Sequence, residues 1–199
     1  MAKLVNWYEF DRKMKDKRLL LFSAMDIRRL FGVSKVAATF LLHRYSKRGF
    51  IVRVKRGFYV FPDALPPELF IANKMVRPSY VSLDFALSYH RVIPETVYEI
   101  ASITTKSTRR FETLGKNYSY RSVKKRVFTG YMTEKQKGFS FQIADPEKAF
   151  VDANYFRIID KLEPISRFDK EKINFEKALH YAKLFHNTAL IGIIKTLLQ

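Results

Sequence analysis

The chain has 199 residues, of which 47% are hydrophobic and 28% charged, a balance typical of a folded protein with one large domain or two small ones. Lysine and arginine outnumber aspartate and glutamate by 37 to 19, and the resulting net charge of +18 favours a polyanionic partner such as nucleic acid. The absence of cysteine excludes disulfides and thiolate chemistry, and no signal peptide or membrane span is evident, so we expect a soluble, cytoplasmic protein without membrane contact.

The first predicted element is a helix over residues 4–18, with Asn6 as its cap and Trp7 as a packing residue. A second, short helix over residues 24–31 is expected to end at Gly32, because glycine readily adopts the left-handed conformation that stops helices. Ser34 then suits the cap of a third helix, whose apolar positions fall on one face with helical spacing. Those apolar residues are Ala38, Leu41, Leu42 and Tyr45.

Residues 51–61 follow with apolar side chains on alternate positions and a basic turn, Lys55-Arg56-Gly57, which together predict a β-hairpin. Helix, turn, second helix and basic hairpin is the order of a winged helix-turn-helix, in which the second helix enters the major groove of DNA. A helix pair and hairpin that serve only packing would give a similar pattern. Three features favour the DNA-binding interpretation: the small Ala38 at a helix contact, an outer helix face without acidic residues, and two cations in the turn.

We predict DNA contacts from the outer face of the second helix of this motif and from the hairpin. Lys35 and Arg44 are best able to reach guanine edges or phosphates, and the hairpin cations would hold phosphates. Residues 1–63 carry 15 basic and 5 acidic side chains, so positive charge is densest around this motif. The predicted DNA-binding residues are Ser34, Lys35, Thr39, His43, Arg44, Arg53, Lys55 and Arg56.

Pro62 and Pro66-Pro67 predict a junction, because proline cannot continue a strand and biases its predecessor toward extended geometry. We therefore expect an α+β protein with a winged helix-turn-helix domain over residues 1–63 and a mixed domain, a β-sheet flanked by helices, over residues 68–199. The second domain is expected to begin with helices over 68–75 and 82–90, the latter capped by Ser82. Strands are expected over 97–105, over 110–114 and 118–123 with a turn at 115–117, and over 126–132 and 138–143 around a polar loop at 133–137. A helix capped by Asp145 and a helical tail over 175–199 with a cap at Asn187 complete the domain.

No pattern points to catalysis. The four histidines lack metal-ligand spacing, and there is no glycine-rich phosphate loop and no Gly-x-Ser-x-Gly motif, so we expect no catalytic residues, no metal and no cofactor. Asp145, Glu147, Lys148 and Asp152 are the compact candidates for a nuclease site, but capping and the helix dipole already explain the first two. A nucleic-acid-processing enzyme, such as a nuclease targeted by the winged helix, is the alternative function.

A basic run in the second domain, interleaved with Phe111, Tyr118 and Tyr120, is typical of a nucleic-acid surface, but strand alternation would also place aromatics inward and cations outward. A solvated or partner-facing surface is the favoured interpretation. A protein that docks a partner through this domain is therefore a third option. The cations of the run are Lys106, Arg109, Arg110, Lys116, Arg121, Lys124, Lys125 and Arg126.

The order of motifs over residues 23–155 resembles the AbiEi-type antitoxins of type IV toxin–antitoxin and abortive infection systems, also described as AbiEi-like transcriptional regulators. The matching segments are residues 56–60 (Arg-Gly-Phe-Tyr-Val), 80–90, 93–98, 104–110 and 144–152, the last with Asp145 where the family has threonine. The resemblance implies a bacterial or archaeal cytoplasmic protein whose winged domain binds double-stranded promoter repeats and represses its own operon. It also implies that the second domain counters a nucleotidyltransferase toxin without a stable complex. Whether the protein would bind such repeats as a homodimer is left open.

Overall fold

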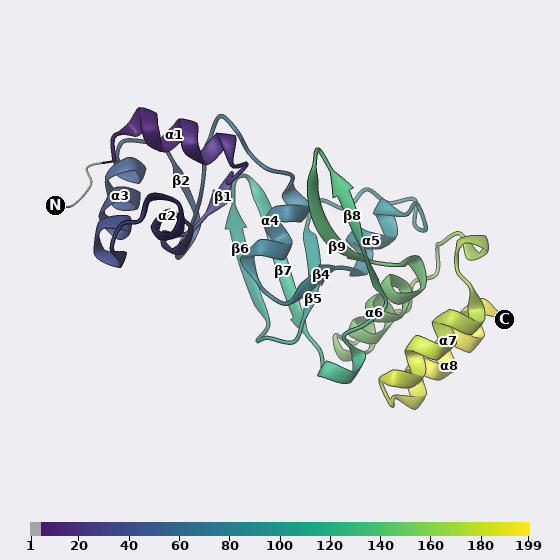
Figure 1. The fold of residues 1–199 in the computed structure, drawn as a ribbon. Helices are drawn as coiled ribbons and strands as arrows, with labels where there is room; N and C mark the ends of the chain where they lie inside the picture. Colours follow the sequence, from purple (N-terminus) through teal and green to yellow (C-terminus); the bar gives the residue numbers. More distant parts are fainter. Residues whose placement is uncertain (1–4) are drawn as a thin grey trace. The chain divides into compact units, whose positions relative to one another are not determined.

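A computed structural model describes residues 5–199, which divide into two compact units (Figure 1). The first unit ends at Pro67, and the second runs from Glu68 to Gln199. Each unit contains helices and its own β-sheet, so the α+β class predicted from the sequence is confirmed.

The first unit places three helices against a small antiparallel sheet. The helices are α1 (Trp7–Asp16), α2 (Ala24–Phe31) and α3 (Lys35–Lys47), and the strands are β1 (Leu21–Phe22), β2 (Val52–Lys55) and β3 (Phe58–Val60). The sheet has the order β1-β3-β2, so β2 of the β2–β3 hairpin is an edge strand. This is the element order of a winged helix-turn-helix, as predicted. The expected cap of α1 is also confirmed, because the Asn6 side chain accepts a hydrogen bond from the Glu9 N–H at 2.8 Å.

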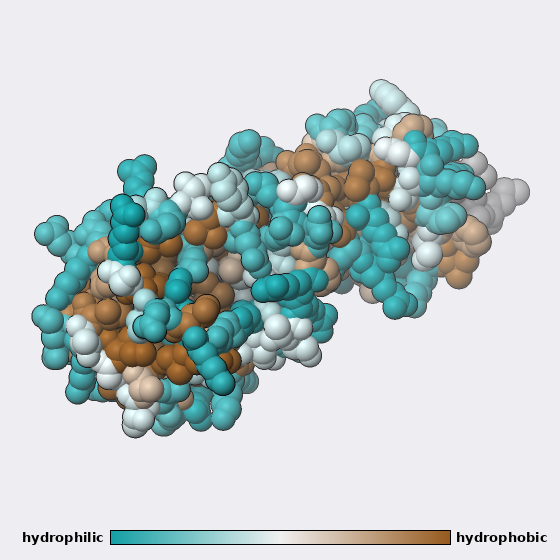
Figure 2. All heavy atoms as spheres, turned by 180° about the vertical axis from the view of Figure 1, so that it is seen from behind, coloured by the Kyte–Doolittle hydropathy of each residue, from teal (hydrophilic) through white to brown (hydrophobic). Residues whose placement is uncertain are grey.

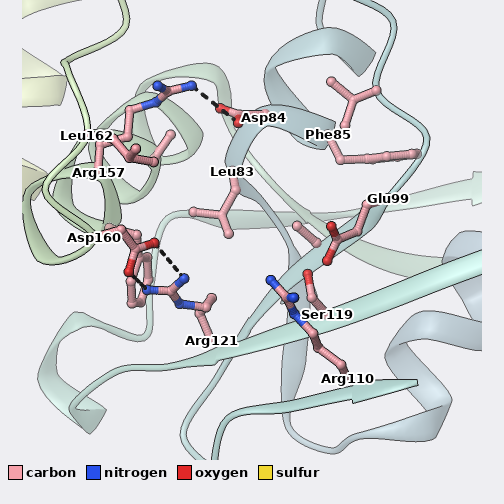
Figure 3. Close-up of a pocket in the computed structure, with 14 residues that line it drawn as sticks. Leu83, Asp84, Phe85, Glu99, Arg110, Ser119, Arg121, Arg157, Asp160 and Leu162 are labelled. Carbon is pink, nitrogen blue, oxygen red and sulfur yellow. Dashed lines mark hydrogen bonds and ion pairs between the residues drawn. The ribbon is translucent and has the colours of Figure 1, made fainter. Parts of the chain in front are cut away.

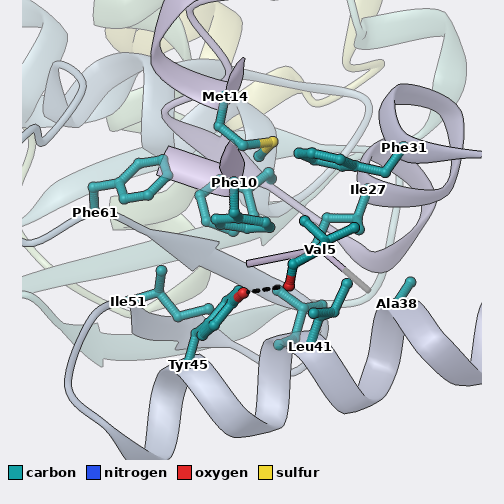
Figure 4. Packing of buried hydrophobic residues seen from close by; sticks show 12 residues of the cluster. Val5, Phe10, Met14, Ile27, Phe31, Ala38, Leu41, Tyr45, Ile51 and Phe61 are labelled. Atoms are coloured by element: carbon teal, nitrogen blue, oxygen red, sulfur yellow. Dashed lines mark hydrogen bonds between the residues drawn. The ribbon is translucent and has the colours of Figure 1, made fainter. Parts of the chain in front are cut away.

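Aromatic and aliphatic side chains together form the core of the first unit (Figure 4). Phe10 of α1 is fully buried, stacks on Phe31 at 5.6 Å between ring centroids, and lies 5.0 Å from the ring of Tyr45 on α3. Trp7 contacts Tyr45 and Phe61 at the same core, in the packing role predicted for it. The apolar faces of α1 and α3 therefore meet inside the unit, which leaves the opposite face of α3 to the solvent.

The second unit is built on a six-stranded mixed sheet of order β6-β7-β5-β4-β9-β8. The pairs β5–β7 and β4–β9 are parallel and the others are antiparallel. The strands are β4 (Ser79–Val81), β5 (Ile100–Thr104), β6 (Arg109–Thr113), β7 (Lys116–Ser122), β8 (Tyr131–Gln136) and β9 (Phe139–Ala144).

Helices cover both faces of this sheet (Figure 1). The Tyr120 hydroxyl on β7 donates a hydrogen bond to the Ala72 carbonyl of α4, whereas the Tyr80 hydroxyl on β4 donates to Asp152 of α6. Tyr80 pairs with Ile103, and Ile103 pairs with Arg121, so these side chains share one face of the sheet. Tyr120 precedes Arg121 in β7 and therefore points to the opposite face. Helix α4 thus lies on one face of the sheet and α6 on the other. The helices of the second unit are α4 (Glu68–Met75), α5 (Leu83–Tyr89), α6 (Pro146–Ile159), α7 (Phe175–Leu184) and α8 (Thr188–Leu198), with short 3₁₀ turns at Lys125–Val127 and Lys170–Lys172.

Two hairpins of the second unit differ from their prediction. Thr113 pairs with Lys116, so the turn consists of Leu114 and Gly115 instead of residues 115–117. The predicted loop at 133–137 is wrong as well, because β8 continues to Gln136 and the turn falls on Lys137 and Gly138. The two residues of each turn have positive φ, 53° and 69° in the first and 50° and 80° in the second, which suits the twist of tight hairpins. The strand predicted over 126–132 instead starts at Tyr131, after the 3₁₀ turn at Lys125–Val127.

Hydrophilic side chains cover most of the surface in Figure 2, and apolar side chains show through as separate patches. Among the residues that the structure describes, no helix combines the length and the apolar character needed to cross a bilayer.

Candidate nucleic-acid interface

The position of α3 follows from two local signals. Gly32 ends α2 with φ of 67°, and its N–H bonds the Arg28 carbonyl. Two residues later, the Ser34 hydroxyl accepts a hydrogen bond from the Ala37 N–H at 3.1 Å and so caps α3. Both predictions are confirmed. The Ser34 hydroxyl is thereby engaged in holding the end of the helix.

The outer face of α3 is exposed and carries no acidic side chain. Lys35, Thr39 and His43 lie on it at successive turns, as predicted. The Thr39 hydroxyl donates to the Lys35 carbonyl at 2.9 Å, which orients its methyl group away from that carbonyl. Within the described residues, the side chains of Lys35 and His43 form no hydrogen bond or ion pair, so the Lys35 ammonium and the His43 ring nitrogens are available to a ligand.

Arg44 has a different environment from the other predicted residues of α3. Its guanidinium donates hydrogen bonds to the Val5 carbonyl at 3.1 Å and to the Tyr45 hydroxyl at 3.2 Å, and lies 5.0 Å from the centroid of the Tyr45 ring. These contacts attach α3 to the segment that precedes α1. Arg44 would have to leave them before it could reach a guanine edge.

The β2–β3 hairpin presents cations near a tight tip. The register shifts by one residue between Arg53 and Lys55, which is a β-bulge, and Gly57 closes the turn with φ of 85°. Arg53 and Arg56 are exposed, and the Lys55 ammonium lies 4.9 Å from the centroid of the Phe58 ring. The three cations lie within residues 53–56, which form the end of the edge strand β2 and the start of the turn.

The predicted set omits two residues of the outer face. Val36 and Phe40 remain 65% and 69% exposed, one helical turn apart, and line a shallow groove with Lys35, Thr39 and His43. Their spacing of i and i+4, outside the apolar face of α3, is a signal that sequence reasoning could have used. The outer face is therefore amphipathic in its own right, with an apolar pair beside cationic and polar groups.

The residues considered for a nuclease site form a buried network instead. Asp152 is fully buried and accepts hydrogen bonds from the Ser82 hydroxyl at 2.8 Å and the Tyr80 hydroxyl at 3.1 Å, and it pairs with the equally buried Lys148. Burial raises the pKa of the Asp152 carboxyl, and the ammonium and the two hydroxyls oppose that rise. Ser82 is the N-cap residue of α5, as predicted, but its hydroxyl makes no capping hydrogen bond, because it donates to Asp152 instead.

The other two carboxylates of this group are also occupied. Asp145 caps α6, as predicted, by accepting from the Lys148 N–H at 2.8 Å, and it also accepts from the Tyr181 hydroxyl at 2.8 Å. The Lys177 ammonium lies 3.1 Å from Asp145 and 2.9 Å from Glu147. Among residues 5–199, no group of three histidine, aspartate or glutamate side chains is placed to hold a metal ion. The arrangement supports a structural role for this network.

Gly130 lies where the start of β8, α6 and α7 come together. Its carbonyl accepts a hydrogen bond from the Asp145 N–H at 3.0 Å, and its φ is 75°. A methyl group at this position would lie 2.7 Å from Cζ of Tyr181 and 2.9 Å from Cγ of Lys148, which is closer than van der Waals contact allows. Glycine is therefore required here both for backbone conformation and for space.

Part of the basic run of the second unit is neutralised by carboxylates. A groove of about 190 Å³ lies on the α5–α6 face of the sheet. Figure 3 shows that arginines in this groove face acidic side chains. Arg121 binds Asp160 through two hydrogen bonds of 2.8 Å, which lower the pKa of Asp160, and Arg157 lies 3.4 Å from Asp84. Tyr118 and Tyr120 point into the core, as strand alternation predicts. The paired arginines make this face less suited to a polyanion than a basic surface without carboxylates would be.

Comparison with known proteins bears on the first unit. Residues 18–62 match the family model described as "Transcriptional regulator, AbiEi antitoxin". The matched segment contains α2, α3 and the β2–β3 hairpin, so the resemblance predicted from the motifs is confirmed there. It covers well under half of the chain, and the second unit lies outside it. No curated protein sequence matches the chain.

Proposed function

Taking the match of residues 18–62 to the AbiEi family of transcriptional regulators and antitoxins as the premise, we propose that this protein binds duplex DNA through α3 and the β2–β3 hairpin. Bound to repeats in its own promoter, in the cytoplasm, it represses its operon. As an antitoxin of a type IV system, it counters a nucleotidyltransferase toxin. The observation that carries the proposal is the exposed, acid-free outer face of α3, followed in the chain by a hairpin with three cations.

The chemistry of this surface suits duplex DNA. An α-helix fits the major groove, where lysine and histidine can donate to base acceptors, and cations beside it can hold phosphates. Lys35 and His43 supply the donors on α3, and Arg53, Lys55 and Arg56 supply the cations of the hairpin. Ser34 places the positive end of the α3 dipole at the same surface, which favours a phosphate there.

Salt dependence of binding tests the DNA-binding part. The full-length protein should bind DNA from upstream of its own gene with an affinity that falls as salt rises, and Arg53→Ala/Arg56→Ala should reduce the slope of log K against log salt by about two, one for each lost phosphate contact. The matched control is Lys170→Ala/Lys183→Ala, which removes two exposed cations from the second unit. Equal slopes for the two double variants would contradict the role of the hairpin.

Co-expression tests the antitoxin part. A nucleotidyltransferase encoded beside this gene should arrest growth when expressed alone, and co-expression of this protein should restore growth. Because the proposed antitoxin role belongs to the second unit, Arg53→Ala/Arg56→Ala should lose repression of a promoter fusion and still restore growth. Loss of both activities in this variant, with the protein folded, would contradict the assignment of the two roles to separate units.

A further inference from the structure

Val36 and Phe40 are exposed and do not belong to the core of the first unit. The core side of α3 is already complete, because Ala38, Leu41 and Tyr45 point into the first unit (Figure 4). Val36 and Phe40 lie on the other side, at 65% and 69% exposure. Leaving a phenylalanine and a valine in water forgoes the free energy of their burial, and apolar patches with a polar rim commonly mark a binding surface.

The surroundings of this pair favour one kind of occupant. The groove that Val36 and Phe40 line is completed by Lys35, Thr39 and His43, and α3 contains no aspartate or glutamate. A ligand that fits must therefore offer apolar groups at its centre and negative charge at its edges. The major groove of duplex DNA has this arrangement, since the C5-methyl groups of thymines lie on its floor and phosphates line both sides.

We propose that Val36 and Phe40 determine sequence specificity by contacting the C5-methyl groups of thymines in the operator, an inference that rests on the proposed binding of α3 to DNA. The methyl of thymine is the one apolar group that base edges present in the major groove, and phenylalanine is among the side chains that contact it. The cations beside the pair supply affinity that is independent of sequence, and the apolar pair selects thymine over other pyrimidines that lack the methyl group.

The spacing of the pair defines what the operator must contain. Val36 and Phe40 lie one turn apart on the helix, about 6 Å along its axis, so their side chains reach base pairs that are one or two steps apart. We therefore expect one or two thymines per half-site whose methyl groups are required for full affinity.

Replacement of thymine by deoxyuridine tests this proposal, because it removes the methyl group and keeps every hydrogen-bonding group of the base. A high-affinity duplex is first selected with the full-length protein, and each thymine in its footprint is then replaced singly. At one or two positions the affinity should fall about fourfold, the value expected for losing one buried methyl. Phe40→Ala and Val36→Ala should bind the thymine and deoxyuridine duplexes equally at the position that each residue contacts.

Two control variants separate this contact from general effects. Tyr8→Ala removes an exposed aromatic residue of α1, at 72% exposure, and should retain the discrimination between thymine and deoxyuridine. Lys35→Ala should lower the salt dependence of binding and also retain the discrimination. Because Val36 and Phe40 lie outside the core, their alanine variants should unfold at the same urea concentration as the parent.

The results that would overturn the proposal are distinct from those against DNA binding itself. Salt-dependent binding to the selected duplex with no loss at any deoxyuridine position would reject the methyl contact and leave DNA binding intact. Unchanged discrimination in Phe40→Ala, with a change of oligomeric state by light scattering, would assign the apolar pair to a contact between copies of the chain. Failure to select any duplex would reject both proposals.

Discussion

The two units carry similar net charge, +10 over residues 1–63 and +8 over the remainder, and use it differently. In the first unit, the described ion pairs centre on Lys15, which lies 2.8 Å from Asp11 and 2.7 Å from Asp63. No such pair with a described residue is formed on the outer face of α3. The second unit joins its cations to carboxylates along its length, in the pairs Lys116–Glu68, Lys148–Asp152, Arg121–Asp160, Arg157–Asp84, Lys172–Asp169 and Lys177 with Asp145 and Glu147.

This difference shows that net charge alone does not locate a surface for a polyanion. A lysine held by a carboxylate must give up that partner before it can bind a phosphate, whereas Lys35 has no such partner within the described residues. The outer face of α3 thus presents a cation that a ligand can bind directly, whereas several cations of the second unit are bound to carboxylates of the same unit. Four measurements test this contrast between the units.

The largest expected effect is on the buried pair of the second unit. Asp152→Ala leaves the Lys148 ammonium buried without a counterion, and we expect it to lower the free energy of unfolding by about 3–5 kcal/mol. Urea unfolding followed by far-UV circular dichroism measures this loss. Trp7, the single tryptophan, lies in the first unit, so its fluorescence reports that unit separately.

The matched control replaces both members of the buried pair by apolar residues. Lys148→Met/Asp152→Leu removes both charges, and such replacements are often neutral, so it should be more stable than Asp152→Ala. A loss below about 1 kcal/mol in Asp152→Ala would show that the pair does not hold the second unit together.

The next effect concerns DNA binding by one cation from each unit. Lys35→Ala should reduce the salt slope by about one, because it removes a cation from the outer face of α3. Arg121→Ala should leave the slope unchanged, because its guanidinium is already bound to Asp160. Isothermal titration with one duplex at several salt concentrations measures both. A larger change for Arg121→Ala than for Lys35→Ala would invert the contrast between the units.

A smaller effect is expected in acid. Burial pushes the pKa of Glu147 up, but the Lys177 ammonium and the Asn174 N–H outweigh it, so the pKa lies below the ordinary value of 4.5. A lowered carboxyl pKa gives stability that is complete above the unfolded value and is lost as pH falls through the folded value. Glu147→Gln should therefore be less stable than the parent at pH 6, and the difference should shrink as the pH falls below about 4.5. A difference that does not depend on pH would contradict the ion pair.

The smallest effect should come from an exposed pair. A guanidinium nitrogen of Arg157 lies 3.4 Å from a carboxylate oxygen of Asp84, and both side chains are partly exposed. Because water screens such a pair, Asp84→Asn should change the free energy of unfolding by only about 0–1 kcal/mol. The same urea titration at low and high salt measures it. If Asp84→Asn lowered the free energy of unfolding as much as Asp152→Ala does, the exposure of an ion pair in this unit would not predict how much the pair stabilises the fold.

Local signals in the sequence predicted much of the fold. The caps at Asn6, Ser34, Asp145 and Asn187 each involve a bond between residues three apart, so the sequence contains both partners of the interaction. The two helices of the motif and the hairpin follow from periodicity in the same way. The residues on the outer face of α3 could be predicted because helical spacing assigns Ala38, Leu41, Leu42 and Tyr45 to the core, and the other positions of the helix must then face the solvent.

Contacts between distant residues could not be predicted in this way. Ser82 appears as a cap in the sequence, but its hydroxyl bonds Asp152, 70 residues away. Arg44 is exposed, as the sequence indicates, but its guanidinium donates to the Val5 carbonyl, 39 residues away in the sequence. The pairing of Ile100 with Tyr118 in parallel strands likewise depends on the register of the whole sheet. In each case a tertiary partner, absent from the local pattern, decides what the side chain does.

The missing side chain at position 130 limits the substitutions that the second unit can accept. Tyr181 of α7 packs over Gly130, and its hydroxyl donates to Asp145 at the start of α6. A side chain at position 130 would have to displace the Tyr181 ring or the Lys148 side chain. A single methyl group there would therefore disturb the contact between α6 and α7, although Gly130 belongs to neither helix.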